Sequence, residues 1–370
     1  MNQKKLRRIA LLHCSAGRFT RWAIFMGAVI AVVAAPFQLF AADYGTSAVG
    51  LVSAAEPVPL ANDGPAIQGE NYPAYEPQDW QPSYGPDCGF GCPPTWRIGA
   101  EYLLWNREGE SNLSLSSGSR LTDFGYEEGG RLTIGHKYDC AIGWEAVYTG
   151  PFEWIQTTTA TGAGTLNTGL GANGINLSAF NGANLHTQTY RSELQSFEAL
   201  QKWWGWDVIT TSAGIRYMNI DENYFFGSVD ANGDLGTFNI RTRNLLVGPQ
   251  LGIEMLFPLG NISFDTNIKG ALFANFGESE VTLVNAGVSQ INNNTDDLEF
   301  AALIQGGYFV RYAVTPRIIA RVGYEYMWIY GLGIATQQIS NPVGVTTGRG
   351  FDGQGDTFYH GAAGGIEIIF

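Results

Sequence analysis

Apolar and polar positions alternate with a period of two along most of the chain from Trp96 to Phe370. Successive side chains of a β-strand point to opposite faces, so this period is the signature of strands. It is clearest near residue 320, where Val322 and Tyr324 share one face and Arg321 and Glu325 fall on the other. The pattern predicts ten strands, at about 96–105, 129–138, 141–150, 190–202, 206–220, 240–257, 261–277, 298–313, 317–330 and 357–370.

The connections between these strands alternate in length. Short links such as 139–140 and 203–205 follow every second strand, and the long links are 106–128, 151–189, 221–239, 278–297 and 331–356. Barrels of the outer membrane have short periplasmic turns and longer external loops. The pattern therefore predicts an all-β fold, a transmembrane up-and-down antiparallel β-barrel of about ten strands. Each of 106–128 and 151–189 is long enough to hide a further hairpin, and one such hairpin raises the number to twelve; an exported soluble β protein is the alternative.

One of the predicted strands contains a proline. Pro249 lies within the run 240–257, away from either end. Proline cannot donate a hydrogen bond to a ladder, so it is found mainly at strand edges, strand starts and bulges. Pro249 thus predicts either a β-bulge or a strand boundary at this point.

The charged positions of the strands share a face opposite the apolar one. An arginine at mid-membrane costs about 2–4 kcal/mol when it faces lipid, so these charges are expected to face the lumen. They either line water and bias the passage of solutes, or pair across a narrow interior. Ten strands is close to the number at which side chains fill a barrel, which favours a narrow or plugged lumen. The predicted lumen-facing residues are Arg97, Glu101, Arg131, Lys137, Glu145, Glu198, Arg216, Glu254, Asp265, Lys269, Arg311, Arg321, Glu325 and Glu367.

The chain begins with the features of an export signal. A basic stretch ends at Arg21, an apolar run reaches about Phe40, and small residues follow at Ala41 and Ala42. Residues 1–42 are therefore predicted to be a signal peptide, with an uncleaved anchor helix as the alternative. Residues 43–95 hold nine of the 15 prolines and form a predicted Pro-rich periplasmic linker, and the barrel occupies 96–370.

Composition narrows the function classes. Glycine provides 48 of the 370 residues, and charged residues only 15%, against about 25% in ordinary soluble domains. This mixture excludes a disordered chain or a coiled coil, and the net charge of −13 disfavours nucleic acid as a partner. In an oxidising compartment, Cys88, Cys92 and Cys140 are disulfide candidates, as a Cys88–Cys92 loop or with Cys140 joined to one of them. A zinc site is the weaker alternative.

Three further motifs do not predict chemistry. Residues 169–174 match GxGxxG but have no strand–helix context, so they are expected to form a flexible external loop. Residues 230–234 imitate the first half of a calcium loop without its distal glutamate, and are expected to form a turn. His136, His186 and His360 belong to no Ser/His/Asp grouping. The sequence therefore predicts no enzyme activity, no cofactor and no metal.

Several segments resemble a known family. The opening strand Trp96–Trp105 (WRIGAEYLLW), the Cys88/Cys92 segment before it, and the segments 143–150, 214–217 and 248–252 resemble the beta-barrel porin seven family. The resemblance covers about residues 85–370 and implies an outer-membrane barrel classed as a porin. It supplies no catalytic residues.

These observations predict an outer-membrane, porin-like barrel that lets small solutes pass through a narrow charged lumen. The alternative is a structural or surface-interaction barrel with a plugged lumen, which acts through its long external loops, above all the Thr/Asn/Gly-rich segment 157–189. The expected partners are outer-membrane lipid and small solutes. The sequence leaves the oligomeric state open.

Overall fold

A computed structural model describes residues 95–108, 113–138, 141–205 and 208–370. The predicted signal peptide, the Pro-rich linker and the disulfide candidates Cys88, Cys92 and Cys140 lie outside the described residues. Within the described ranges, no helix has the length and apolarity that crossing a membrane requires.

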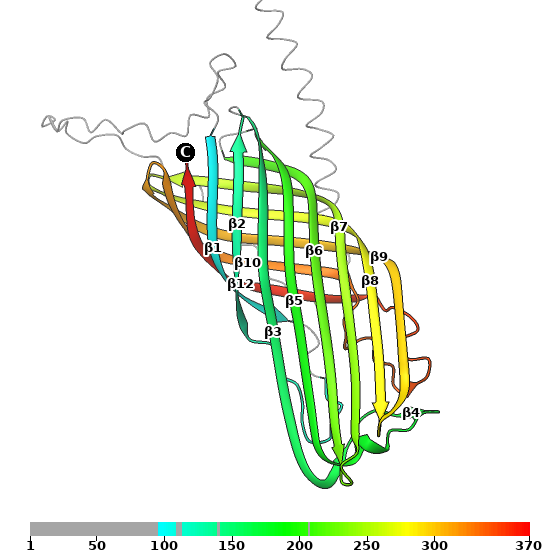
Figure 1. The fold of residues 1–370 in the computed structure, drawn as a ribbon. Coiled ribbons are helices and arrows are strands. Elements are labelled where there is room, and N and C mark those ends of the chain that lie inside the picture. The colour runs from blue at the N-terminus through cyan, green and yellow to red at the C-terminus, as the bar shows by residue number, and fades with distance from the viewer. Residues whose placement is uncertain (1–94, 109–112, 139–140, 206–207) are drawn as a thin grey trace, which may run out of the picture. The chain divides into compact units, whose positions relative to one another are not determined.

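The chain forms a closed antiparallel barrel of ten strands (Figure 1). Consecutive barrel strands are neighbours, and β1 closes the barrel against β12, so the predicted up-and-down topology is confirmed. Short strands β4 and β11 pair with each other in parallel outside the barrel, and one 3-10 helix precedes β5. The elements are β1 Thr95–Glu108, β2 Tyr126–Lys137, β3 Ile142–Asn167, β4 Ala172–Asn173, η1 Ser178–Phe180, β5 Asn181–Trp204, β6 Ile209–Asp230, β7 Leu235–Leu259, β8 Ile262–Asn285, β9 Val288–Thr315, β10 Ile318–Leu332, β11 Val343–Gly344 and β12 Gly355–Ile369.

The predicted long connections are only partly loops. Strands β6 and β7 continue to a tight hairpin at 231–234, and β8 and β9 continue to a hairpin at 286–287. Most of 151–189 belongs to β3 and β5, and no additional barrel hairpin occurs in the described part of the chain. The prediction of loops over 151–189, 221–239 and 278–297 was therefore wrong, because these segments extend the strands. Long connections remain between β1 and β2, between β3 and β5 at 168–180, and between β10 and β12.

The extra length is confined to one side of the barrel. β2 pairs with β3 only from Gly130 to Lys137, and β10 pairs with β9 only up to Ala302. Beyond these points six strands continue as an open sheet (Figure 1). We call this sheet the extension; it consists of residues 151–167 of β3, 181–195 of β5, 219–230 of β6, 235–244 of β7, 277–285 of β8 and 288–301 of β9.

A break in the ladder marks where β3 enters the extension. The register between β3 and β5 shifts between Thr149 and Phe152. Gly150 lies at this shift with φ +123°, a conformation that disfavours side chains, and a Cβ there would lie 2.9 Å from the carbonyl oxygen of Leu194. The bulge lets β3 part from β2 while it stays paired with β5.

The outer surface of the ten-stranded part is an apolar belt. Outward positions include Tyr102, Leu132, Ile215 and Phe264, and all four side chains are exposed. The belt extends from the end of the barrel that holds its two termini to a rim formed by Glu108, Glu128 and Asp356. Between these limits, no Asp, Glu, Lys or Arg occupies an outward position of the described strands. On the extension the outward positions become polar, as with Thr157, Asn239 and Arg241.

Pro249 lies in the middle of β7 without a bulge. It pairs in regular register with Ile215 of β6. On the β8 side, the ladder skips from Val247 to Gln250 with no register shift. The expectation of a bulge or a boundary was wrong, because two unpaired positions accommodate the missing donor.

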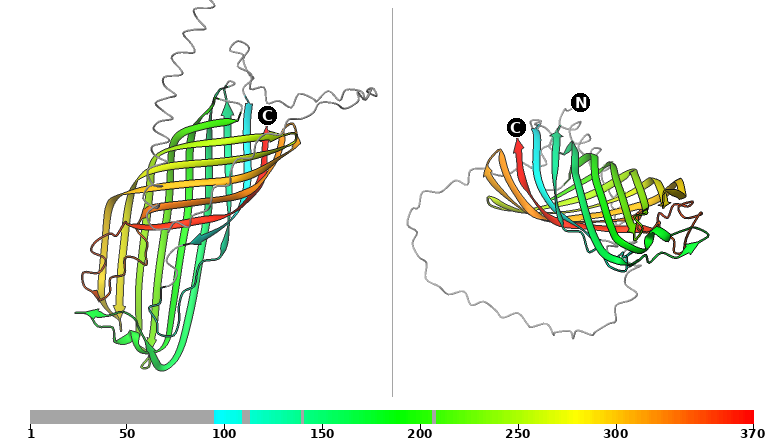
Figure 2. Two further views of the ribbon diagram at one scale, coloured as in Figure 1. Left: turned by 180° about the vertical axis from the view of Figure 1, so that it is seen from behind. Right: turned by 60° about the horizontal axis from the view of Figure 1, so that its bottom comes forward.

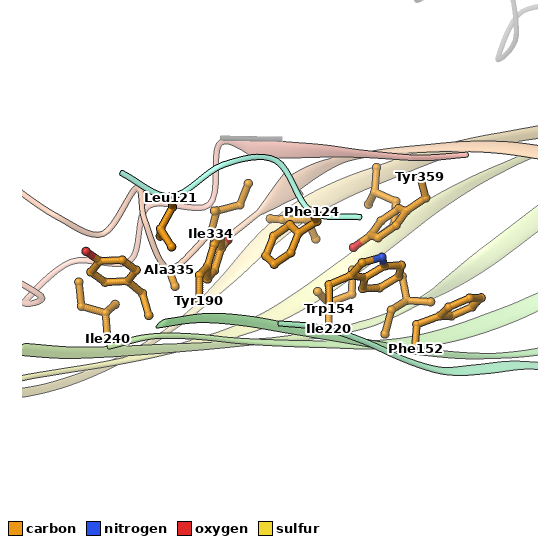
Figure 3. Packing of buried hydrophobic residues seen from close by; sticks show 14 of the residues in the cluster. Leu121, Phe124, Phe152, Trp154, Tyr190, Ile220, Ile240, Ile334, Ala335 and Tyr359 are labelled. Atoms are coloured by element: carbon orange, nitrogen blue, oxygen red, sulfur yellow. The ribbon is translucent and has the colours of Figure 1, made fainter. Parts of the chain in front are cut away.

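A hydrophobic core lies inside the extension. Trp154, Ile220 and Ile240 project from its inner face, and loop residues Leu121 and Phe124 face them from the opposite layer (Figure 3). Viewed from behind, the β10–β12 connection lies beside the hairpin of β8 and β9 (Figure 2), and Asn293 of β9 donates to the carbonyl oxygens of Val345 and Thr347 in that connection. The loops therefore complete a two-layer core over the open sheet.

Candidate functional site in the barrel interior

The interior of the ten-stranded part brings together charged side chains from distant strands. Thirteen of the fourteen predicted lumen residues take part in ion pairs there, together with Lys202, which the prediction did not include. We call these side chains the network. For the remaining predicted residue, Lys137, the ammonium nitrogen lies 4.9 Å from the ring centroid of Trp204.

Arg131 of β2 lies at the centre of the first of three clusters in this network. Its terminal nitrogens donate to the two carboxylate oxygens of Glu325 at 2.8 and 2.6 Å. One of them also donates to Glu101 at 2.7 Å, and Glu101 in turn accepts from Arg321. A two-pronged arginine–carboxylate contact fixes both groups and is among the strongest of charged hydrogen bonds. This cluster links β1, β2 and β10 across the interior.

A second cluster crosses from β5 to β8. Glu198 accepts from Lys269 at 2.8 Å and from the side-chain amide of Gln250 at 2.7 Å. Arg216 lies 3.7 Å from the same carboxylate and donates to Ser196 at 2.9 Å. Arg216 and Glu198 are almost completely buried. The polar groups of this layer are thus engaged with one another.

A third cluster surrounds the terminal end of the barrel. Lys202 lies between Glu254 at 2.8 Å and Glu145 at 3.0 Å, and Arg97 bonds to Glu145. Glu367 joins Arg97 at 3.5 Å to Arg311 at 2.9 Å.

The network is electrically balanced. It contains seven cationic and seven anionic side chains, although the whole chain has a net charge of −13. The cavity that these residues line has a volume of about 80 Å³. A water molecule takes about 30 Å³ in the liquid, so the cavity has room for only a few waters. The paired charged side chains therefore fill this part of the barrel, and they leave no wide aqueous path between them.

On the side of the network toward the extension, a separate ion pair is enclosed by the hydrophobic core. Arg107 of β1 bonds to Glu222 of β6, and both side chains are about 1% exposed. The Arg107 guanidinium lies 5.0 Å from the ring centroid of Phe124 and 5.4 Å from that of Tyr190. Glu222 also accepts from the Tyr190 hydroxyl at 2.7 Å and from the backbone N–H of Ala335 at 3.0 Å. This pair therefore holds the β10–β12 connection to the barrel wall.

Two buried asparagines anchor the same connection at its start. Asn244 of β7 donates to the carbonyl of Gly333 at 2.9 Å and accepts from its N–H at 2.7 Å. Asn275 of β8 donates to the carbonyl of Gly331 at 2.9 Å. Because the backbone groups of a buried loop need partners, these side chains make the inward path of the connection possible.

The sequence does contain a signal for the residues that the prediction missed, because residues an even number of positions apart on a strand share a face. Lys202 is an even number of positions from Glu198, and Arg107 from Glu101. The same is true of Glu222 and Arg216. Arg107 and Glu222 were overlooked because the predicted strands ended at 105 and 220.

The β10–β12 connection is also held by a ring contact that can be tested. A Cβ added at Gly277 of β8 would come within 2.2 Å of the Phe351 ring. Gly277→Val is therefore expected to displace Phe351 and destabilise the connection by about 1–3 kcal/mol, the usual cost of overpacking. Limited proteolysis of the refolded protein should then cut within 333–354 faster than in the wild type.

The matched control is Gly270→Val on the same strand. The nearest atom to an added Cβ there is the carbonyl oxygen of Leu303 at 3.9 Å, so the side chain fits without displacement. Equal cleavage rates for the two variants would contradict the role of the Phe351 contact.

The remaining motifs occupy ordinary positions. Residues 230–234 form the β6–β7 hairpin turn, where the backbone N–H groups of Asp234 and Asn232 donate to the Asp230 carboxylate and lower its pKa. Residues 172–173 of the glycine-rich segment pair with β11, so part of it is ordered against a second loop. His186 is buried with its Nδ1 2.8 Å from the Ser116 hydroxyl.

No protein-family model matches the chain, and no curated protein sequence matches it. The resemblance to the beta-barrel porin seven family thus rests on the quoted sequence segments alone. Solved structures with a similar arrangement include the outer membrane protease OmpT from Escherichia coli, at 11% identity and a TM-score of 0.36, with 76% of this chain and 98% of that chain covered. A major outer membrane protein from Thermus thermophilus has 10% identity and a TM-score of 0.29, with 75% and 99% covered. The translocator domain of the autotransporter NalP from Neisseria meningitidis has 8% identity and a TM-score of 0.32, with 74% and 88% covered. At these values the likeness is one of barrel architecture and assigns no activity.

Proposed function

We propose that this protein is an outer-membrane β-barrel with a closed interior, which presents its extension at the cell surface as an interaction module. The apolar belt supports the membrane location, since lipid-exposed strands need outward apolar side chains and a closed ladder without free edges. The ten-stranded part has both features. The termini of the barrel lie on the side of the short turns, which supports a periplasmic position for that end.

The filled interior is the observation that carries the closed state. A conducting porin needs an aqueous channel, and barrels with open channels have sixteen or more strands. Here ten strands enclose balanced ion pairs in the belt region, and the loops close a hydrophobic core above them. The passage of solutes through a narrow charged lumen, the other prediction from the sequence, has less support from this arrangement.

The surface of the extension supports an interaction role. Outside the interior, the described residues include 16 acidic and seven basic side chains. All of these acids lie at the hairpin end of the barrel, on the extension, the loops or the adjoining rim. An acidic face of this kind steers cationic partners and repels anionic ones.

Planar-bilayer recording tests the closed interior. Refolded full-length protein is expected to insert without discrete conductance steps, whereas a sixteen-stranded porin reconstituted in parallel gives them. Folding is verified by the shift in gel mobility between unboiled and boiled samples, and insertion by co-flotation of the protein with lipid vesicles. Stepwise currents that scale with the amount of inserted protein would refute the closed interior and favour solute passage.

A further inference from the structure

The extension has two free strand edges, because the barrel neighbours of β3 and β9 end before it does. Beyond Gly150, β3 has no strand partner on its β2 side among the described residues. Beyond Ala302, toward its hairpin, β9 likewise lacks a partner on its β10 side within the described ranges. A free edge presents backbone N–H and C=O groups that can pair with another extended chain.

The β9 edge is protected. Asp296 and Asp297 place carboxylates along it, and charged residues on an edge oppose pairing with another strand. Asn293 donates to the Thr347 carbonyl at 2.7 Å, and Thr295 donates to the Gly348 carbonyl at 2.9 Å. The β10–β12 connection therefore lies against this edge.

The β3 edge is less protected. Gln156 donates to the Thr122 hydroxyl at 2.9 Å and to the Asp123 carbonyl, so the β1–β2 loop contacts the start of the edge. From Gln156 to Thr165 its sequence is QTTTATGAGT, without a charge or a proline. Thr157, Thr159 and Thr161 are exposed on its outer face, whereas outward residues of the central strand β6, such as Asn223, are half-buried. The described β1–β2 loop pairs by backbone only with the far end of β3, at Asn167 and Thr168. Gln156 to Thr161 pair in unbroken register with β5, and threonine favours extended structure, so this part is a preformed template for a further strand. Beyond Thr161 the register with β5 shifts, and Gly164 has φ +71°.

The charges at the base of the β3 edge indicate the chemistry of the occupant. β2 leaves β3 at Gly130, and Glu128 and Glu127 follow two and three positions further toward the β1–β2 loop, near the base of the free edge. Glu153 also lies there, but it is paired with Arg191 at 2.9 Å. The base of the edge is therefore acidic, and it complements a positively charged chain end.

We propose that the free edge of β3 binds an extended polypeptide segment with a basic end, which adds to the extension as a seventh strand. Backbone hydrogen bonds along Gln156–Thr161 supply the pairing, and Glu127 and Glu128 hold the basic end. The proposal deepens the interaction role of the extension and rests on it. It is tested separately, because conductance reports on the interior and peptide binding reports on the edge.

The test uses the refolded full chain in detergent and a fluorescein-labelled ten-residue peptide of alternating Thr and Val with two Lys residues at one end. Fluorescence anisotropy is expected to show saturable binding. Two peptides methylated on alternate backbone nitrogens form the matched pair, since only one set of N–H groups faces the edge. One of them is expected to bind about tenfold more weakly or worse, because several hydrogen bonds are lost, and the other is expected to bind like the parent.

Two protein variants place the site. Glu127→Gln/Glu128→Gln is expected to weaken binding several-fold and to reduce its dependence on salt. Glu278→Gln/Asp296→Asn, which removes two outward carboxylates beside the β9 edge, is expected to leave binding unchanged. Absence of saturable binding, equal weakening by both methylation patterns, or a larger loss with the second variant would each overturn the proposal. A dimer of the chain, detected by ultracentrifugation, that the peptide does not dissociate would assign the edge to a second copy instead and would also overturn it.

Discussion

Glu325→Ala is expected to lower the free energy of unfolding of the refolded barrel by about 3 kcal/mol, the lower end of the range for breaking a buried ion pair. Glu325 is 2% exposed and holds both terminal nitrogens of Arg131. Its removal leaves a buried guanidinium with Glu101 as the remaining charged partner at 2.7 Å. Guanidinium titration of the protein in detergent, followed by tryptophan fluorescence, measures the change.

The matched variant removes both members of the pair. Arg131→Met/Glu325→Leu replaces them by apolar side chains of similar volume, and such replacements are often neutral or stabilising. We expect the double variant to recover most of the loss caused by Glu325→Ala. A double variant that is less stable than the single one would show that Arg131 also stabilises the barrel through its other contacts, with Glu101 at 2.7 Å and the Thr149 hydroxyl at 3.3 Å.

The sequence predicts well which side chains form the apolar belt and which charged side chains face the interior, and the reason is physical. Lipid on one side and a polar interior on the other impose strict alternation, so residues such as Ile318 and Arg321 reveal their faces by parity. The number of strands follows from the same pattern. Parity does not predict which charges pair, because the register between strands brings Arg131 to Glu325 across 194 positions of sequence.

The extension was harder to predict. Outside lipid, the outward residues of a strand are polar, and in segments such as Thr157–Thr165 small residues occupy both faces. A polar, glycine-containing strand has the composition of a loop, so the predicted strands ended too early. The missed ion pair of Arg107 and Glu222 follows from this, since both residues lie just beyond the predicted ends.

The loop layer has no local signal at all. Ala335 reaches Glu222 across 113 positions, and Asn244 reaches Gly333 across 89. These contacts depend on the open side of the extension, which exists because β2 and β10 end early. Loops usually run over the surface of a protein as solvent-exposed connections, and the prediction treated these segments in that way. It fails here because an open sheet needs a second layer to cover its apolar face.

Glu222→Ala is expected to have the largest effect, a loss of about 5 kcal/mol, the upper end of the range for removing one member of a buried ion pair. Arg107 then keeps no carboxylate partner among the contacts described, and faces the rings of Phe124 and Tyr190. The Tyr190 hydroxyl and the N–H of Ala335 also lose their acceptor. Denaturant titration measures the loss, and proteolysis is expected to cut the β10–β12 connection far more rapidly.

Two further variants separate the charge from the hydrogen bonds. Glu222→Gln keeps an acceptor for Ala335 but removes the charge, so its loss should be intermediate, with the connection better protected than in Glu222→Ala. Arg107→Met/Glu222→Leu removes the buried charge, so global stability should recover while the N–H of Ala335 still has no acceptor. The connection should then remain sensitive to protease in a stable barrel. If its protection recovers together with stability, the buried carboxylate is not what holds the connection in place.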